Sequence, residues 1–91
     1  MSAPPAPDSL ITYPCHFPIK VMALQSPGWV EEMLAIARRF DPDFDPLTVE
    51  QRPSKAGKYL GLTLTVHVHN RAQLDDLYRA LSSHPLVKVV L

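Results

Sequence analysis

One run of alternating residues limits what this chain can fold into more than any other feature. From residue 59 to residue 69, leucine or valine stands at every even position, and tyrosine, glycine, threonine or histidine stands at every odd one. Successive side chains of a β-strand point to opposite faces of its sheet, so the run predicts a strand with one apolar and one polar face. The fold must therefore contain a sheet with one buried face.

The rest of the chain changes between strand-like and helix-like patterns. Two further segments alternate with a period of two, and a short apolar run closes the sequence. Two other segments carry apolar residues at the three- and four-residue spacing of a helix with one buried side. In order, we predict a strand at 16–25, a helix at 27–40, a strand at 47–52, the alternating strand at 58–69, a helix at 71–84 and a final strand at 86–91.

Residues at the helix ends support both helices. Ser26 suits the N-cap of the first helix and Pro27 suits its first position, because proline has no N–H to leave unpaired there. Asn70 suits the N-cap of the second helix, and Gln73, three residues later, can hydrogen-bond back toward it. The prolines of the segment DPDFDP, residues 41–46, end the first helix.

The order of these elements predicts an α+β sandwich of the ferredoxin-like βαββαβ type. Right-handed crossovers give a four-stranded antiparallel sheet with strand order 4-1-3-2 and two helices on one face. The apolar row at 60–68 should face the helices. The opposite face should stay open, and it should carry Lys20, Arg52, Tyr59, Thr63, Thr65, His67, His69 and Lys88.

Length and composition favour one small domain without a nucleic-acid or membrane partner. The chain has 91 residues; we assign 1–12 to a flexible, proline-rich tail and 13–91 to the domain. Nine lysines and arginines balance nine acids, so net charge gives no attraction to nucleic acid. We see no signal sequence and no apolar run that would span a membrane, which indicates a cytoplasmic protein. The single cysteine excludes an internal disulfide.

Two motif-like segments fail as phosphate and calcium loops. The pair Gly57-Lys58 lacks the other glycine, the serine or threonine and the helix of a P-loop, because Tyr59 follows and a strand begins there. The acids of DPDFDP resemble the start of a calcium loop. However, Pro46 stands where glycine is needed and Arg52 where glutamate is needed. We interpret the first segment as a turn and the second as a solvated acidic loop.

The histidines and the cysteine do not assemble a catalytic set. His67 and His69 share one strand face, but a zinc site needs three or four ligands, and no other residue points obviously at them. Cys15 and His16 are adjacent, so on a strand their side chains point to opposite faces and are poorly placed for proton transfer. We therefore expect no metal, no cofactor and no enzymatic activity. A small enzyme that uses His67, His69 or Cys15 is the third-ranked alternative.

The basic hairpin near residue 57 is the candidate binding site. Cations around a glycine turn can hold a carboxylate or phosphate, and arginine offers a two-pronged donor. The alternative is that these cations only deter edge-to-edge pairing of strands. The candidate ligand-binding residues are Lys20, Arg52, Ser54, Lys58 and Tyr59. The candidate interface residues are Thr63, Thr65, His67 and Lys88, on a face that suits a homodimer or a partner protein.

Three segments resemble the YbeD-like family of small bacterial proteins. They are YPCHFPIKVM at 13–22, RPSKAGKYLGLTLTV at 52–66 and QLDDLYRALSSHPLVKVVL at 73–91. The family's pattern is similar to Y-P-C-x-F-x-I-K, R-x-S-x-x-G-K-Y and H-P-x-V-K-x-V-L. The matching positions are Tyr13, Pro14, Cys15, Phe17, Ile19, Lys20, Arg52, Ser54, Gly57, Lys58, Tyr59, His84, Pro85, Val87, Lys88, Val90 and Leu91.

The resemblance implies a fold similar to ACT regulatory domains, which bind small molecules and pair through their sheets. In those domains the ligand often lies by the first strand–helix loop, here residues 25–29. Family members often lie near genes of lipoate attachment, which implies a metabolic or regulatory role. We therefore expect a non-enzymatic regulatory or adaptor domain that pairs through its sheet face or edge and binds a small anionic metabolite or a partner protein. The alternative is a pure protein-interaction module without a ligand.

Overall fold

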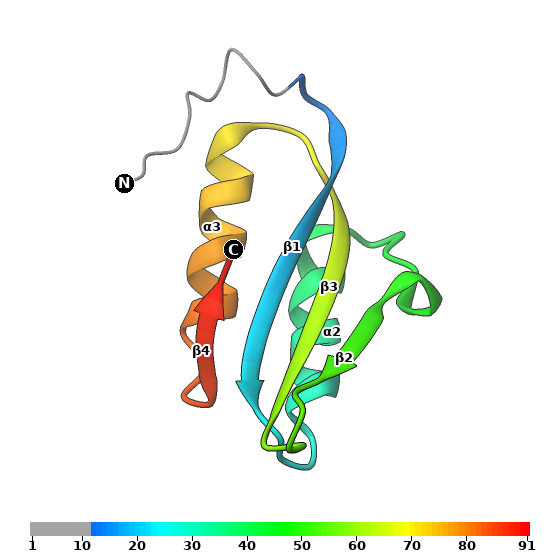
Figure 1. Cartoon of the computed structure of the whole chain (residues 1–91). Coiled ribbons are helices and arrows are strands. Elements are labelled where there is room, and N and C mark those ends of the chain that lie inside the picture. The colour runs from blue at the N-terminus through cyan, green and yellow to red at the C-terminus, as the bar shows by residue number, and fades with distance from the viewer. Residues whose placement is uncertain (1–11) are drawn as a thin grey trace.

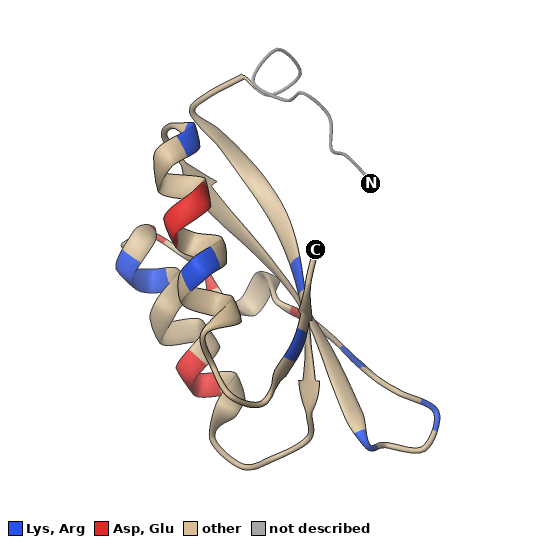
Figure 2. Ribbon diagram, turned by 90° about the vertical axis from the view of Figure 1, so that its left-hand side faces the viewer, with Lys and Arg blue, Asp and Glu red and all other residues tan. Residues whose placement is uncertain are grey.

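Four antiparallel strands form one sheet, and two helices cover one of its faces (Figures 1 and 2). The computed structural model describes residues 12–91, so the predicted tail lies outside the described residues except for its last position. The elements are β1 (Cys15–Leu24), α2 (Trp29–Phe40), the 3₁₀ turn η1 (Pro46–Thr48), β2 (Glu50–Pro53), β3 (Tyr59–Val68), α3 (Arg71–Ser82) and β4 (Val87–Val90). The strand order β2-β3-β1-β4 confirms the predicted 4-1-3-2, read from the other edge.

The apolar row of β3 faces the helices, as its alternation predicted. Every even residue from Leu60 to Val68 is buried, whereas the odd residues of the strand are partly exposed. This row packs against buried residues of β1 and of both helices. The buried helix residues are Trp29, Met33, Ala37, Leu74, Leu77 and Leu81. Full burial of a large apolar side chain contributes about 1.5–3 kcal/mol, so this layer supplies most of the stabilisation.

The two edge strands cover only one end of the long central pair. β1 pairs with β3 along all ten of its residues, but β2 pairs only with residues 60–63 of β3. β4 pairs only with β1 residues from Lys20 onward. Pro18 lies in the part of β1 beyond β4, where its missing N–H would point toward no strand of the described residues. The sheet is therefore wide at the end that holds the β2–β3 hairpin and narrow at the other.

The start of α2 differs from the prediction. Ser26 is not its N-cap, and Pro27 is not its first residue: the helix begins at Trp29, with Gly28 as a cap that makes no side-chain hydrogen bond. Gly28 has a φ of 88°, a left-handed conformation that glycine adopts without the steric cost of a side chain. Residues 27 and 28 thus form a turn before the helix, and Trp29, the first helical residue, is buried in the core with 1% exposure.

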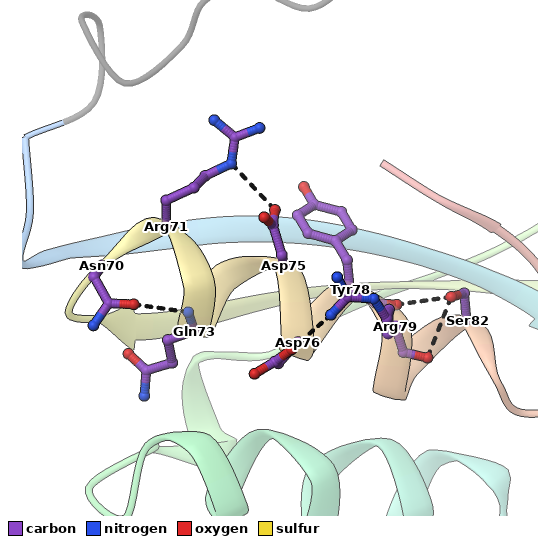
Figure 3. Close-up of polar contacts among 8 residues, drawn as sticks. All are labelled: Asn70, Arg71, Gln73, Asp75, Asp76, Tyr78, Arg79 and Ser82. Atoms are coloured by element: carbon purple, nitrogen blue, oxygen red, sulfur yellow. Dashed lines mark hydrogen bonds and ion pairs between the residues drawn. The ribbon is translucent and has the colours of Figure 1, made fainter.

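The start of α3 confirms the predicted cap and adds a second function for Gln73. The Asn70 side chain accepts a hydrogen bond of 2.8 Å from the Gln73 backbone N–H (Figure 3). The Gln73 side chain accepts one of 2.6 Å from the backbone N–H of His69. It also donates one of 3.0 Å to the backbone carbonyl of Phe40. Gln73 therefore joins the start of α3 to the end of α2.

The outer side of α3 carries exposed ion pairs. Arg71 lies 3.1 Å from Asp75, and Arg79 lies 2.6 Å from Asp76 (Figure 3). All four side chains are about half exposed or more. Exposed pairs of this kind contribute roughly 0–1 kcal/mol each. These contacts support the helix. The helices cover one face of the sheet, and the other face remains open.

His84 joins the turn before β4 to the first turn of α2. Its Nδ1 accepts a hydrogen bond of 3.1 Å from the Leu86 backbone N–H, so in the neutral ring the proton is on Nε2. That nitrogen contacts the Glu32 carboxylate. The side chain is only 14% exposed, which gives this histidine of the family-like motif a structural role.

Candidate functional site

The strand register arranges the open sheet face in rows that run across the strands. One row holds Glu50, Thr63, Lys20 and Leu91, in the order β2, β3, β1 and the residue after β4. The next row holds Arg52, Gly61, Met22 and Val89 in the same order. Neighbouring strands lie about 4.8 Å apart. Side chains on β2 and β1 therefore stand about 10 Å apart across each β3 residue.

A hollow lies on this face where β3 has no side chain. It has a volume of about 640 Å³, and Gly61 is part of its lining. We call it the Gly61 hollow. Among the candidate residues predicted from the sequence, it brings together Lys20, Arg52, Ser54, Tyr59 and Thr63. Thr65, His67 and Lys58 lie outside it.

Gly61 is not required by the backbone of β3. A Cβ atom there would lie 3.6 Å from the Arg52 carbonyl oxygen and 4.0 Å from the Val21 carbonyl oxygen, which are ordinary contact distances. Its φ is not positive, so a side chain would cause no backbone strain. A strand interior also favours residues with side chains over glycine. The glycine therefore opens space on the face without being needed for the turn or the strand.

The charged residues of the hollow have no partners within the described part of the chain. Lys20 and Arg52 are exposed, and neither forms an ion pair or a side-chain hydrogen bond with residues 12–91. Glu50 also lines the hollow and is likewise unpaired there. Among the side chains of the lining, the lysine and the arginine bring two positive charges and the glutamate one negative. The two unpaired cations can therefore donate hydrogen bonds to an anionic group of a ligand.

The remaining wall of the hollow is apolar. Met22, Val89 and Leu91 are 44%, 42% and 69% exposed, and all three line it. Lys88, which the sequence placed on this face, lies where the register between β1 and β4 shifts, next to Ala23 and Met22. The end of the chain therefore contributes two residues to the lining, Val89 in β4 and Leu91 just after it.

Two residues of the basic hairpin have a structural role in its turn. The Ser54 hydroxyl accepts a hydrogen bond of 3.0 Å from the Tyr59 N–H, and the Ser54 carbonyl accepts one of 2.9 Å from the Gly57 N–H. Gly57 has a φ of 76°, which explains a glycine there. This confirms the turn interpretation. Lys58 lies outside the hollow, with its Nζ 5.6 Å from the centre of the Tyr59 ring.

The histidines gather at the narrow end of the same face. The His67 ring centre lies 4.7 Å from that of His16 and 4.9 Å from that of His69. We call these three residues the histidine cluster. Among the described residues, no group of three or more histidine, cysteine, aspartate or glutamate side chains is placed to hold a metal ion. Cys15 packs toward the core, on the side away from His16.

Asp41 corrects the interpretation of residues 41–46 as a wholly solvated loop. It is 7% exposed, and one carboxylate oxygen accepts a hydrogen bond of 3.0 Å from the His67 backbone N–H. The other oxygen accepts one of 3.0 Å from the Asp43 N–H. β2 does not reach this part of β3, so Asp41 satisfies an N–H that would otherwise lie on a bare strand edge. Asp43 and Asp45 are exposed, as predicted.

Comparison with known proteins places this chain in one family. A family model described as "Protein of unknown function (DUF493)" matches residues 8–91. The chain belongs to the DUF493 family. A UPF0250 protein of Leptothrix cholodnii is 62% identical over 87 residues, which cover 96% of each chain. A UPF0250 protein of Bordetella pertussis is 55% identical over 87 residues, again 96% of each chain.

These matches confirm the predicted resemblance to the YbeD-like family. The solution structure of HP0495 from H. pylori is similar to this DUF493 protein with a TM-score of 0.69, covering 99% of this chain and 98% of that one. At 21% identity, that likeness shows the fold alone. Within residues 12–91, no helix is long and apolar enough to cross a membrane.

Proposed function

We propose that this DUF493 protein is a non-enzymatic regulatory or adaptor domain that binds a small organic anion in the Gly61 hollow. One observation carries the proposal: two cations without partners, Lys20 and Arg52, line the same hollow as an exposed apolar wall. A ligand with one carboxylate and an apolar chain satisfies both parts. Its carboxylate accepts charge-assisted hydrogen bonds, and its chain removes the apolar wall from water.

The lining supports binding without chemistry. It contains no histidine, the side chain that most often transfers protons in catalysis, and no cysteine. Its serine, Ser54, lies in the hairpin turn, where its hydroxyl accepts a hydrogen bond from the Tyr59 N–H. The histidine cluster lies at the other end of the sheet face. We also propose a cytoplasmic location. Family members often lie near genes of lipoate attachment, which supports a regulatory role in that process.

A titration followed by amide NMR tests this proposal. The probes are octanoate, lipoate and acetate, with inorganic phosphate as an anion that has no apolar part. We expect shifts at Lys20, Arg52 and Gly61, with octanoate binding more tightly than acetate. Each buried CH₂ contributes about 0.8 kcal/mol, so several buried methylenes separate the two ligands by more than tenfold in affinity.

Filling the hollow provides the matched control. In Gly61→Phe the ring occupies the hollow without a backbone clash, so octanoate binding should be lost while the fold is kept. Thr65→Phe places the same ring on the same strand face but outside the hollow, and binding should persist. If octanoate and lipoate leave the amide signals around Gly61 unchanged at millimolar concentration, the proposal is wrong.

The exposed apolar wall also favours a second candidate, a module that docks a partner protein. Met22, Val89 and Leu91 lie in adjacent rows and are exposed together. Affinity capture distinguishes the two functions: a single recurring partner that is lost in Lys20→Glu or Lys88→Glu, together with no octanoate binding, supports the protein partner. Octanoate binding without such a partner supports the anion.

A further inference from the structure

The outer edge of β2 is open. Ser54 N–H bonds to the Tyr59 carbonyl, and the register places Arg52 opposite Gly61 and Glu50 opposite Thr63. Because hydrogen-bonding residues alternate along an antiparallel pair, Glu50 and Arg52 direct their N–H and C=O groups toward β3. Gln51 therefore directs its N–H and C=O outward, and no residue in 12–91 pairs with β2 on that side. All four residues of the strand are exposed.

The charges on this edge are self-complementary in one register only. Two copies of β2 that pair antiparallel about a two-fold axis can be centred on residue 50, 51 or 52. A centre at 50 or at 52 sets Glu50 against Glu50, or Arg52 against Arg52. The centre at Gln51 sets Glu50 of each copy opposite Arg52 of the other, on the open face of both sheets. Unlike charges directly opposite each other stabilise a strand pair, and like charges destabilise it.

We infer that two copies of this chain pair through β2, centred on Gln51. The two Gln51 residues exchange backbone hydrogen bonds, and each unpaired Glu50 gains the partner's Arg52. Pro53 is compatible with this register. It has no N–H to donate to the partner strand, but the hydrogen bonds between the two Gln51 residues do not need one there. The pairing joins two sheets into one of eight strands, with all helices on one side and both Gly61 hollows on the other.

This pairing goes beyond the proposed ligand and does not depend on it. A guanidinium has five donors, so pairing with the partner's carboxylate leaves Arg52 donors for a bound anion. The two Gly61 hollows become neighbours across the two-fold axis, because both are lined by Glu50 and Arg52. A contact of two short strands buries an area at the low end for protein pairs, so we expect a dimer that dissociates on dilution.

Charge-swapped variants test the pairing by analytical ultracentrifugation between about 10 µM and about 1 mM, a range chosen for a weak complex. The full chain should shift from monomer to dimer over this range. Glu50→Arg alone and Arg52→Glu alone set like charges opposite each other, so each should stay monomeric. An equal mixture of the two variants should form a heterodimer. The double variant Glu50→Arg/Arg52→Glu restores unlike pairs and should dimerise alone. A monomeric full chain, or a dimer that both single swaps leave intact, overturns the pairing.

A cross-link tests the register itself. In a Cys15→Ala background, Gln51→Cys places two thiols opposite each other, with Cα atoms about 5.5 Å apart as in a hydrogen-bonded antiparallel pair, which suits a disulfide. Lys55→Cys, an exposed position in the same hairpin but away from the two-fold axis, should cross-link much more slowly. Equal cross-linking at both positions rejects the Gln51-centred register. Octanoate binding is measured separately, so loss of dimerisation and loss of the ligand are distinguishable.

Discussion

The two ends of the open sheet face share β1 and β3, but they differ in how far other residues of the chain contact their polar groups. At the narrow end, the rings of the histidine cluster contact one another, and Asp41 holds the N–H of His67. At the wide end, Lys20 and Arg52 have no partner within the described residues, and Met22 is 44% exposed. At the narrow end, the chain itself accepts a strand-edge N–H and packs the rings together, whereas at the wide end two cationic side chains have no partner within residues 12–91. This difference gives the narrow end a structural role and supports the proposal that the wide end binds a ligand.

The edge strands explain why the ends differ. β2 and β4 flank β3 and β1 only at the wide end, where their side chains form the two walls of the Gly61 hollow. At the narrow end no strand within residues 12–91 flanks the pair, and an aspartate from the loop after α2 covers the β3 edge instead. Sequence positions that alternate in the same way along β3 thus face different surroundings. Mutations at the narrow end should therefore change stability, and mutations at the wide end should change ligand binding.

The largest expected effect is on stability at the narrow end. Asp41→Ala removes the acceptor of two backbone N–H groups, those of His67 and Asp43. Losing two hydrogen bonds to a buried carboxylate and leaving the part-buried His67 N–H unpaired should lower the free energy of unfolding by about 2–4 kcal/mol. Urea denaturation measures this change. Asp43→Ala, an exposed neighbour, should change the free energy of unfolding by less than about 0.5 kcal/mol.

Equal effects of the two aspartate substitutions would show that the Asp41 contact does not stabilise the fold. The amide of His67 gives an independent readout, because its hydrogen exchange should accelerate in Asp41→Ala. In Asp43→Ala the carboxylate of Asp41 still accepts the His67 N–H, so exchange at that amide should stay slow.

The next effect is on binding at the wide end and not on stability. Arg52→Ala removes a charge-assisted donor from the Gly61 hollow, which should weaken octanoate binding about tenfold or more. The side chain is exposed and makes no contact with a partner in residues 12–91, so the free energy of unfolding should change by less than about 0.5 kcal/mol. Isothermal titration and urea denaturation on the same sample give both quantities.

Lys58→Ala is the matched control, since Lys58 belongs to the same basic hairpin but lies outside the hollow. It should leave octanoate affinity nearly unchanged. If Lys58→Ala weakens binding as much as Arg52→Ala, the hairpin attracts anions through its overall charge, and the Gly61 hollow is not the site.

The features that follow from local periodicity were predictable, and those that depend on contacts between distant segments were not. The alternation at 59–69 was sufficient to predict which residues of β3 face the helices. The hydrogen bond between Asp41 and His67 spans 26 positions in the chain, and no pattern near Asp41 indicates it. Asp41 lies among exposed acids, so composition favoured a solvated loop.

The candidate site was predicted in part for the same reason. Lys20 and Arg52 have the strand parity of the open face, and parity is a local property. Gly61 was visible in the polar row, but its importance depends on both neighbouring strands leaving space above it. The β4 wall could not be predicted, because a register shift near Met22 and Ala23 decides which residues of a short apolar strand face the hollow. A shift of one residue exchanges the two faces of a strand.

The smallest expected effect is within the histidine cluster, where the comparison between the two ends can be made sharper. His67→Ala removes a partly exposed ring that contacts His16, but it keeps the backbone N–H that Asp41 accepts. Contacts between rings contribute about 0.5–1.5 kcal/mol, and exposure favours the lower value. Combining His67→Ala with His16→Ala in a double-mutant cycle should give a coupling of about 0.5 kcal/mol in urea denaturation. Octanoate affinity should be the same in all four proteins of the cycle, because no histidine lines the Gly61 hollow. A loss of affinity in His67→Ala without a loss of stability would move the binding site to the narrow end and reverse the assignment of the two ends.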